Sequence, residues 1–285
     1  MAFLDHIARC NAHDLAKFRP LRVAGQRVGW VRHDTAARLA AFPRIFQVTE
    51  EAITLDPHLD DPDSRSAAVD AVAAALAAEG AAPKPKGERY RVAARWGEPA
   101  LMTVDRGLVS LFGIRAYGIH VNGWVKRPDG LHLWIGRRAA DRAVEPGKLD
   151  NMIAGGQPAH LTLMDNLVKE AWEEAAVPEA LARRARPVGA VSYCLEDEWG
   201  LKPDLMFCFD LAVPADFTPH NTDGEISGFQ CLKAAEVAAR IRDGGDFKFN
   251  VNLVILDFLV RHGVLSPDDE PDYIAIVGGL RQGDD

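Results

Sequence analysis

Residues 155–177, GGQPAHLTLMDNLVKEAWEEAAV, restrict the fold of this chain more than any other stretch. Thr162 and Asp165 have the spacing of a helix N-cap and its capping box. Pro178 marks the other end, because proline cannot continue the hydrogen bonds of a helix interior. Between them the apolar residues recur at helical spacing: Met164, Leu167, Val168, Ala171 and Ala175. The sequence therefore predicts a glycine turn, a short loop and an amphipathic helix.

Three acidic residues, Glu170, Glu173 and Glu174, crowd this helix. Glu170 and Glu174 repel each other across one turn, so we expect a positive group among them. A solvated face is the usual position of acidic residues and is one interpretation. Small alanines, which allow close approach to a sheet, and the glycine pair upstream favour the other. In that interpretation the carboxylates hold a divalent cation together with phosphate oxygens.

This stretch resembles a Nudix box, G-x5-E-x7-R-E-U-x-E-E-x-G-U, in which U is aliphatic. The corresponding residues are Gly155, Leu161, Lys169, Glu170, Glu173, Glu174, Ala176 and Val177. Three of them depart from the pattern, because Leu161 replaces Glu, Lys169 replaces Arg and Ala176 replaces Gly. The longer segment 152–181 resembles the branch of the Nudix family that is related to proteins fused to, or associated with, thiamine pyrophosphokinase. In that branch the first Glu is normally missing.

The resemblance implies an α/β protein with a Nudix fold, a mixed sheet sandwiched by helices, preceded by a smaller α/β accessory domain. We expect the accessory domain at residues 1–112 and the Nudix hydrolase domain at residues 113–285. The implied reaction is hydrolysis of a diphosphate bonded to an organic group.

The resemblance also assigns roles to residues. Glu170, Glu173 and Glu174 are expected to hold Mg²⁺ or Mn²⁺ together with Gly155, and Glu173 or Glu174 also to steer the attacking water. Lys169 takes the place of the Arg that orients these glutamates. In the segment 225–229, EISGF, Glu225 corresponds to the extra carboxylate that many Nudix enzymes supply to the metal.

Substrate contacts are predicted outside this motif. Arg137 and Arg138 follow the predicted strand 131–136, and a guanidinium binds phosphate bidentately. Two solvent-facing arginines are the other interpretation. Lys148 is a further candidate for the diphosphate. Trp199 lies in the polar loop 196–204, EDEWGLKPD, where it either covers an aromatic group of the substrate or packs at the rim.

Resemblance to this branch implies thiamine diphosphate or its oxidised, damaged analogues as substrate, converted to the monophosphate and phosphate. ADP-ribose or another nucleoside diphosphate derivative is the alternative within the same chemistry. A catalytically weak Nudix domain that senses a ligand is an alternative of another class. The three glutamates retained on the helix argue against it.

Periodicity and turn signals predict the remaining elements. In the first domain we expect helices at 3–10, 35–41 and 66–79 and strands at 21–23, 28–32, 45–49, 52–55 and 90–95. In the second, strands are expected at 115–124, 131–136, 152–153, 188–195 and 205–211. Helices are expected at 178–185, 234–241 and 249–262, and a last strand at 273–277.

Composition limits the partners. A net charge of −8 and a pI near 5.6 argue against a general nucleic-acid binder, which needs a basic face. No apolar run is long enough for a transmembrane helix. The N-terminal segment is amphipathic and carries acidic residues, unlike a signal peptide. The four cysteines are scattered, which is typical of reduced thiols in the cytoplasm. We therefore expect a small-molecule diphosphate as partner, no nucleic acid and no membrane; a homodimer stays open.

Overall fold

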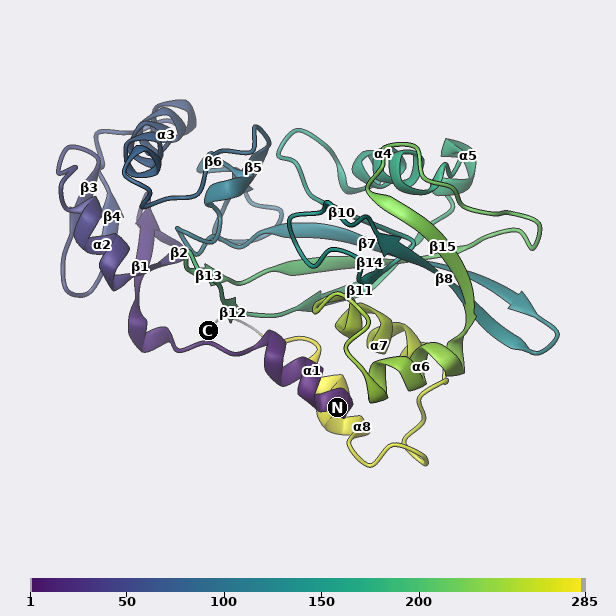
Figure 1. Cartoon of the computed structure of the whole chain (residues 1–285). Helices are drawn as coiled ribbons and strands as arrows, with labels where there is room; N and C mark the ends of the chain where they lie inside the picture. Colours follow the sequence, from purple (N-terminus) through teal and green to yellow (C-terminus); the bar gives the residue numbers. More distant parts are fainter. Residues whose placement is uncertain (1, 283–285) are drawn as a thin grey trace.

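The structure, a computed structural model, describes residues 2–282. A four-stranded sheet in the order β2-β1-β4-β3 forms the centre of the first part of the chain (Figure 1). Its strands are β1 (Phe18–Val23), β2 (Gln26–Arg32), β3 (Phe46–Val48) and β4 (Ile53–Leu55). The helices α2 (His33–Leu39) and α3 (Pro62–Ala78) and the hairpin of β5 (Arg89–Val92) and β6 (Met102–Asp105) pack with this sheet in one apolar cluster. Asp61 caps α3 by accepting hydrogen bonds from the N–H groups of Asp63 and Ser64.

A larger mixed sheet follows, in the order β11-β14-β7-β8-β15, with β10 beside β7 and β9 beside β8. Its long strands are β7 (Tyr117–Arg127), β8 (Gly130–Arg138), β11 (Arg186–Ser192), β14 (Leu205–Ala212) and β15 (Ile226–Lys233). The short strands are β9 (Leu149–Asp150) and β10 (Ile153–Gly156). β14 runs parallel to β7, whereas β7 and β8 form the predicted antiparallel hairpin, in which Arg127 pairs with Gly130.

Helices cover both faces of this sheet because its side chains alternate in direction. Phe209 and Leu211 of β14 pack in the cluster that includes α4 (Leu163–Ala175) and α5 (Glu179–Ala182). Met206 and Cys208 of the same strand pack in the cluster that includes α6 (Ala234–Asp243) and α7 (Val251–Arg261). Figure 1 shows the two helical layers on opposite sides. This arrangement confirms the predicted α/β fold, a mixed sheet sandwiched by helices.

The first helix, the segment 273–277 and the loop after β11 differ from the predictions or from the order of the chain, and the strands β6 and β15 were not predicted. The helix α1 (Phe3–Cys10) precedes the first sheet in the sequence but packs in the apolar cluster that includes α6 and α7. There it lies beside α7 and α8. The strand predicted at 273–277 is wrong, because these residues form the helix α8 (Tyr273–Gly279), which lies against α1. The polar loop after β11 contains a short hairpin of β12 (Leu195–Glu196) and β13 (Leu201–Lys202). Within residues 2–282, no helix is both long and apolar enough to cross a membrane.

Candidate active site

The helix α4 begins and ends as its sequence predicts. The Thr162 hydroxyl oxygen accepts a hydrogen bond from the N–H of Asp165 at 3.1 Å and donates one to the Asp165 carboxylate at 2.7 Å. Leu167, Ala171 and Ala175 are fully buried against the sheet. Ala176 closes the helix with a φ of 49°, in the left-handed region that glycine adopts without strain. This conformation explains why the Nudix box has glycine at this position.

Of the three glutamates of α4, Glu174 is buried and Glu170 is partly buried. Glu174 is 5% exposed and accepts a hydrogen bond from the N–H of Ala154 at 2.7 Å. Burial, followed by the nearby charge of Asp150, raises the pKa of Glu174 well above its ordinary value. Burial also raises the pKa of Glu170. Gly155 makes this position of Glu170 possible, because a Cβ there would lie 2.5 Å from Cδ of the glutamate.

Lys169 supplies the positive group that the sequence predicts among these acids. Its Nζ lies 3.1 Å from Oε1 of Glu170 and 2.6 Å from Oε2 of Glu173. Burial opposes the charge of Lys169, but the two glutamates outweigh it and raise the pKa of the ammonium group. Lys169 therefore holds Glu170 and Glu173 in position.

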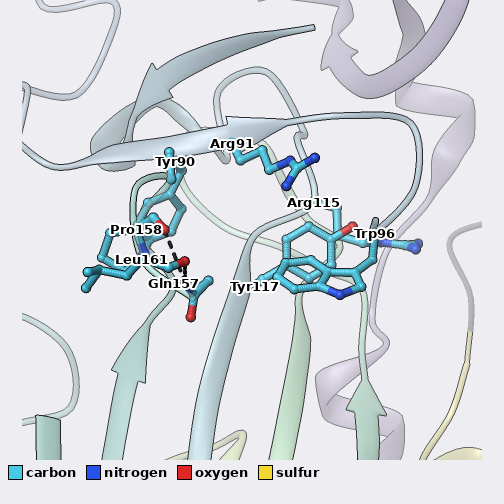
Figure 2. Close-up of a pocket in the computed structure, with 9 residues that line it drawn as sticks. Tyr90, Arg91, Trp96, Arg115, Tyr117, Gln157, Pro158 and Leu161 are labelled. Atoms are coloured by element: carbon cyan, nitrogen blue, oxygen red, sulfur yellow. Dashed lines mark hydrogen bonds between the residues drawn. The ribbon is translucent and has the colours of Figure 1, made fainter. Parts of the chain in front are cut away.

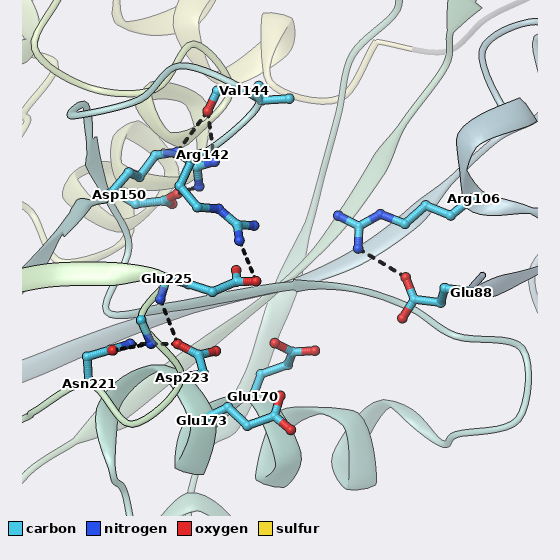
Figure 3. A network of polar contacts seen from close by, with 12 residues as sticks. Glu88, Arg106, Arg142, Val144, Asp150, Glu170, Glu173, Asn221, Asp223 and Glu225 are labelled. Carbon is cyan, nitrogen blue, oxygen red and sulfur yellow. Dashed lines mark hydrogen bonds and ion pairs between the residues drawn. The ribbon is translucent and has the colours of Figure 1, made fainter. Parts of the chain in front are cut away.

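The loop before β15 brings Glu225 to the same place. The Thr222 hydroxyl donates to the carbonyl oxygen of Glu173 at 2.8 Å, and so the loop is tied to α4. Asp223 accepts a hydrogen bond from the N–H of Glu225 at 2.8 Å. Figure 3 shows Glu225 above Glu170 and Glu173, with its carboxylate 2.5 Å from Nη1 of Arg142. The negative charge of Glu225 contributes to the raised pKa of both Glu170 and Glu174.

The donors at this site suit a hard divalent cation, which prefers oxygen ligands. Among residues 2–282, no group of three or more acidic, histidine or cysteine side chains converges closely enough to hold a metal ion by itself. Mg²⁺ is commonly held by only one or two carboxylates and completes its shell with phosphate oxygens and water. The buried Glu174 and the partly buried Glu170, whose pKa values are raised by burial, fit a cation of that kind.

The basic residues predicted to meet the diphosphate are engaged with other partners. Arg138 is 9% exposed, and its guanidinium donates to the Asp150 carboxylate at 2.9 Å and to the carbonyl oxygen of Val144. Arg137 donates to the carbonyl oxygen of Gly147 at 2.7 Å, and Lys148 donates to the carbonyl oxygen of Gly245. A phosphate group would compete with these contacts, and the binding of the diphosphate by these three residues stays a prediction.

An aromatic pocket lies between the β5–β6 hairpin and the loop that leads to α4 (Figure 2). Its lining comprises Tyr90, Arg91, Trp96, Arg115, Tyr117, Gln157, Pro158, Ala159 and Leu161. The ring of Trp96, which is 43% exposed, lies 4.7 Å from the rings of both Tyr117 and Phe207. Leu161, the residue that replaces the first Glu of the Nudix box, is thus part of an apolar wall.

Tyr90 connects this pocket to the glycine pair. A Cβ on Gly156 would lie 1.6 Å from the hydroxyl oxygen of Tyr90, so only glycine leaves room for the tyrosine. The N–H of Ala159 donates to the carbonyl oxygen of Arg89 at 2.8 Å. The first part of the chain therefore supports the loop before α4 directly.

Trp199 is not among the residues that line this pocket. It lies in the turn between β12 and β13, where its N–H donates to Oδ1 of Asp197 at 2.9 Å. The same carboxylate accepts a hydrogen bond from the hydroxyl of Ser110 at 2.8 Å, and Arg32 donates to the Asp197 carbonyl oxygen. These contacts hold the turn beside the first sheet, and a contact of Trp199 with the substrate stays a prediction.

Four residues around the pocket and the acidic helix were not expected from the sequence: Tyr90, Trp96, Arg142 and Asp223. Tyr90, Trp96 and Arg142 reach their positions through contacts between distant segments, and no local motif marks them. Asp223 was missed although its contact with Glu225 is local.

Comparison with known proteins relates the whole chain to one family. It is 39% identical over 286 residues to Nudix hydrolase 24, chloroplastic, of Arabidopsis thaliana, covering 99% of this chain and 78% of that protein. It is 37% identical over 293 residues to Nudix hydrolase 20, chloroplastic, of the same plant, with the same coverage. Residues 2–116 match a domain of unknown function, DUF4743. A solved structure from Deinococcus radiodurans aligns with 59% of this chain and 97% of its own, at 23% identity and a TM-score of 0.45.

Proposed function

This chain belongs to the Nudix hydrolase family, whose members hydrolyse small-molecule diphosphates, and we propose thiamine diphosphate or its oxidised analogues as the substrate. The products would be the monophosphate and phosphate. The observation that carries the proposal is the position of an aromatic pocket directly beside the acidic helix, with Gly155 and Gly156 between them. A flat ring in the pocket would leave its diphosphate near Glu170 and Glu174.

We assign the divalent cation, Mg²⁺ or Mn²⁺, to Glu170, Glu173, Glu174, Glu225 and Gly155. When bound, such a cation neutralises charge on diphosphate oxygens. Glu173 or Glu174 also steers the attacking water. Lys169 keeps Glu170 and Glu173 oriented as a compact point charge, where the family motif has the planar fork of Arg.

The charge of the pocket distinguishes between ring types. Trp96 and Tyr117 offer aromatic surface for stacking. Arg91 and Arg115 are the charged residues of the lining, which contains no carboxylate. Two positive charges disfavour the cationic thiazolium of intact thiamine and favour an oxidised, neutral ring. ADP-ribose is the second candidate, because its adenine is neutral and its diphosphate suits the arginines.

We further propose a cytoplasmic location, which the scattered cysteines support because they are typical of a reducing compartment.

Phosphate release in the presence of Mg²⁺ tests the proposal. The substrates are thiamine diphosphate, an oxidised thiamine diphosphate, ADP-ribose and a nucleotide sugar. A phosphatase added after the reaction releases phosphate from monophosphate products, so that hydrolysis of ADP-ribose and the nucleotide sugar is also detected. The Glu174→Gln variant keeps an acceptor for the N–H of Ala154 but loses a charge, so we expect its kcat to fall about a hundredfold or more.

Glu179→Gln, an exposed acid on α5, is the matched control and should retain full turnover. Equal turnover of Glu174→Gln and the wild type would remove Glu174 from the metal site and leave it a structural role at the N–H of Ala154. Binding of a diphosphate without any turnover would identify a ligand sensor instead.

A further inference from the structure

Two basic residues of the first domain, Lys86 and Arg106, have no role in the site described so far. Lys86 belongs to the loop 83–87 before β5, and Arg106 begins the short helical turn that follows β6 (Arg106–Leu108). Figure 3 shows Arg106 and its partner Glu88 facing the acidic network from the side opposite Arg142. Nη1 of Arg106 lies 3.1 Å from Oε2 of Glu88, and the arginine side chain keeps 45% of its surface exposed.

A buried carboxylate fixes these two cations beside each other. Asp105 is 5% exposed and accepts hydrogen bonds from the N–H groups of Lys86 at 2.8 Å, Gly87 at 2.7 Å and Gly107 at 2.7 Å. The two loops also pack tightly, because a Cβ on Gly107 would lie 2.8 Å from the carbonyl oxygen of Lys84. Lys86 and Arg106 are therefore presented by a rigid double turn.

Four cations gather at this place from separate parts of the chain. Burial, and then repulsion from Arg106, Lys202 and Arg142, lowers the pKa of Lys86. Glu170 is among the acids whose charge raises the pKa of Arg106 against the opposing effect of burial. In the described part of the chain, the Nε of Arg142 is buried without a hydrogen-bond partner. The cations thus lie within electrostatic range of one another and of the acidic helix.

Glu88, Glu225 and Asp204 already pair with Arg106, Arg142 and Lys202, and the grouping of four cations would attract a further anion. We propose that Lys86 and Arg106 bind the phosphate oxygens of the substrate, so that the first domain completes the active site. Arg106 contributes a planar fork and Lys86 a mobile point charge, a pair suited to a diphosphate that must also reach a cation on α4. This inference rests on the proposed function, since it concerns the same diphosphate.

The first test measures binding of methylenediphosphonate, a diphosphate analogue that is not hydrolysed, by calorimetry in Mg²⁺ buffer. Arg106→Gln should weaken its binding about tenfold or more, since a hydrogen bond between charged groups is lost, and Lys86→Gln should weaken it as well. Arg106→Lys, which keeps the charge, should bind better than Arg106→Gln. Arg38→Gln removes an exposed ion pair of the same domain, with Glu79, and should bind like the wild type.

Glu88→Gln separates phosphate binding from a structural role. It breaks the Arg106–Glu88 ion pair but leaves the cation in place, so it should bind the analogue at least as tightly as the wild type. If the ion pair mattered only for folding, Arg106→Gln and Glu88→Gln would lower the melting temperature and the affinity alike. That result, or unchanged affinity in Arg106→Gln, would overturn the proposal.

Hydrolysis then distinguishes this inference from the proposed function. If the wild type and Arg106→Gln hydrolyse the substrate with the same KM, the proposed function stands and the role of Arg106 is wrong. If the wild type binds the analogue through Arg106 but hydrolyses no diphosphate, the proposed function fails and the phosphate site stands.

Discussion

Two neighbouring glycines in the loop before α4 are needed for different reasons. Gly155 gives room to Glu170, an acid of the helix that follows it, whereas Gly156 gives room to Tyr90, which comes from the first domain. In the sequence they form a single glycine pair, which indicates only that backbone approaches something closely. The structure separates a requirement of the acidic helix from a requirement of the contact with the first part of the chain.

Gly156→Ala should therefore destabilise the contact between the two parts of the chain. The new methyl group would overlap the Tyr90 hydroxyl, and Tyr90 is 5% exposed and cannot move aside freely. We expect the free energy of unfolding in urea to fall by about 1–3 kcal/mol, as for other overpacked sites. Adding Tyr90→Phe should restore part of the loss, because it removes the hydroxyl oxygen at 1.6 Å. The nearest remaining atom, Cζ of the ring, then lies 2.8 Å from the new methyl group.

Gly228→Ala is the matched control, since nothing lies within 4 Å of a Cβ at that position and its φ is not in the left-handed region. Equal stability of Gly156→Ala and Gly228→Ala would contradict the close contact with Tyr90. The absence of any rescue by Tyr90→Phe would place the strain elsewhere in the loop.

The basic residues of the site show where sequence reasoning ends. An arginine at the end of a strand, such as Arg138, has the same local signal whether it binds phosphate or stabilises a loop. Its role is decided by Asp150 and Val144, which the fold brings to it. Arg106 approaches Glu170 only because the first part of the chain packs against the acidic helix, whereas Arg142 reaches Glu225 from a loop 83 residues earlier in the same part of the chain.

Elements whose signals are local were predicted well. Thr162 caps α4, and the turn at 127–130 joins β7 to β8 as expected. The segment 273–277, YIAIV, is too short and too uniformly apolar for its periodicity to separate strand from helix. It becomes the helix α8 because α1, from the other end of the chain, offers a helical surface to pack against.

A chain of buried polar side chains connects β7 and β14 to α7, on the face of the larger sheet opposite α4. His120 of β7 bonds to Oδ1 of Asn151 at 2.9 Å, Asn151 donates to Asn122 at 2.8 Å, and Asn122 donates to Asp210 of β14 at 3.2 Å. Asp210 in turn accepts from Arg261 of α7. Burial, and then the charge of Lys248, lowers the pKa of His120 from 6.5 to about 4.

This pKa predicts a loss of stability in mild acid. Between pH 6.5 and about 4 the unfolded chain binds a proton at His120 that the folded chain does not, so unfolding is favoured as the pH falls through this window. The contribution is fully present above pH 6.5 and decreases by up to about 1.4 kcal/mol per pH unit below it.

Urea unfolding of the wild type and of His120→Gln at pH 7, 6 and 5 measures the effect. Glu174, whose pKa is raised, contributes in the opposite direction, because an acid that holds its proton in the folded state favours folding as the pH falls. That contribution is common to both proteins and cancels in their difference. The stability lost on acidification should be smaller in His120→Gln; parallel curves would contradict the assignment to His120.

At the scale of the whole molecule, the two ends of the described chain meet. Phe3, Ile7 and Cys10 of α1 are almost fully buried in the cluster that α7 and α8 form beneath the larger sheet. His6 bonds to the carbonyl oxygen of Ile241 at 2.8 Å, and Gly279 of α8 leaves room for Ile7. The chain therefore starts in the layer of the hydrolase fold, leaves it to form the first domain, and returns.

This path predicts that a change in the first helix destabilises the distant C-terminal layer. Phe3→Ala should lower the free energy of unfolding by about 3–5 kcal/mol, as large-to-small changes of buried aromatic residues do. It also removes the ring under the guanidinium of Arg242, whose Cζ lies 4.8 Å from its centre. Hydrogen exchange should then show reduced protection in α7 and α8, while β1–β4 keep theirs.

Ile274→Ala is the matched control, because this residue of α8 is 80% exposed and its truncation should change stability by less than about 0.5 kcal/mol. If α1 were instead a part of the first domain, Phe3→Ala would reduce protection in β1–β4 and leave α7 and α8 unchanged. The distribution of exchange therefore decides to which layer the first helix belongs. The same measurement bears on residues 113–285 produced alone. If α1 covers α7 and α8, this shorter chain would expose the apolar surface that α1 buries.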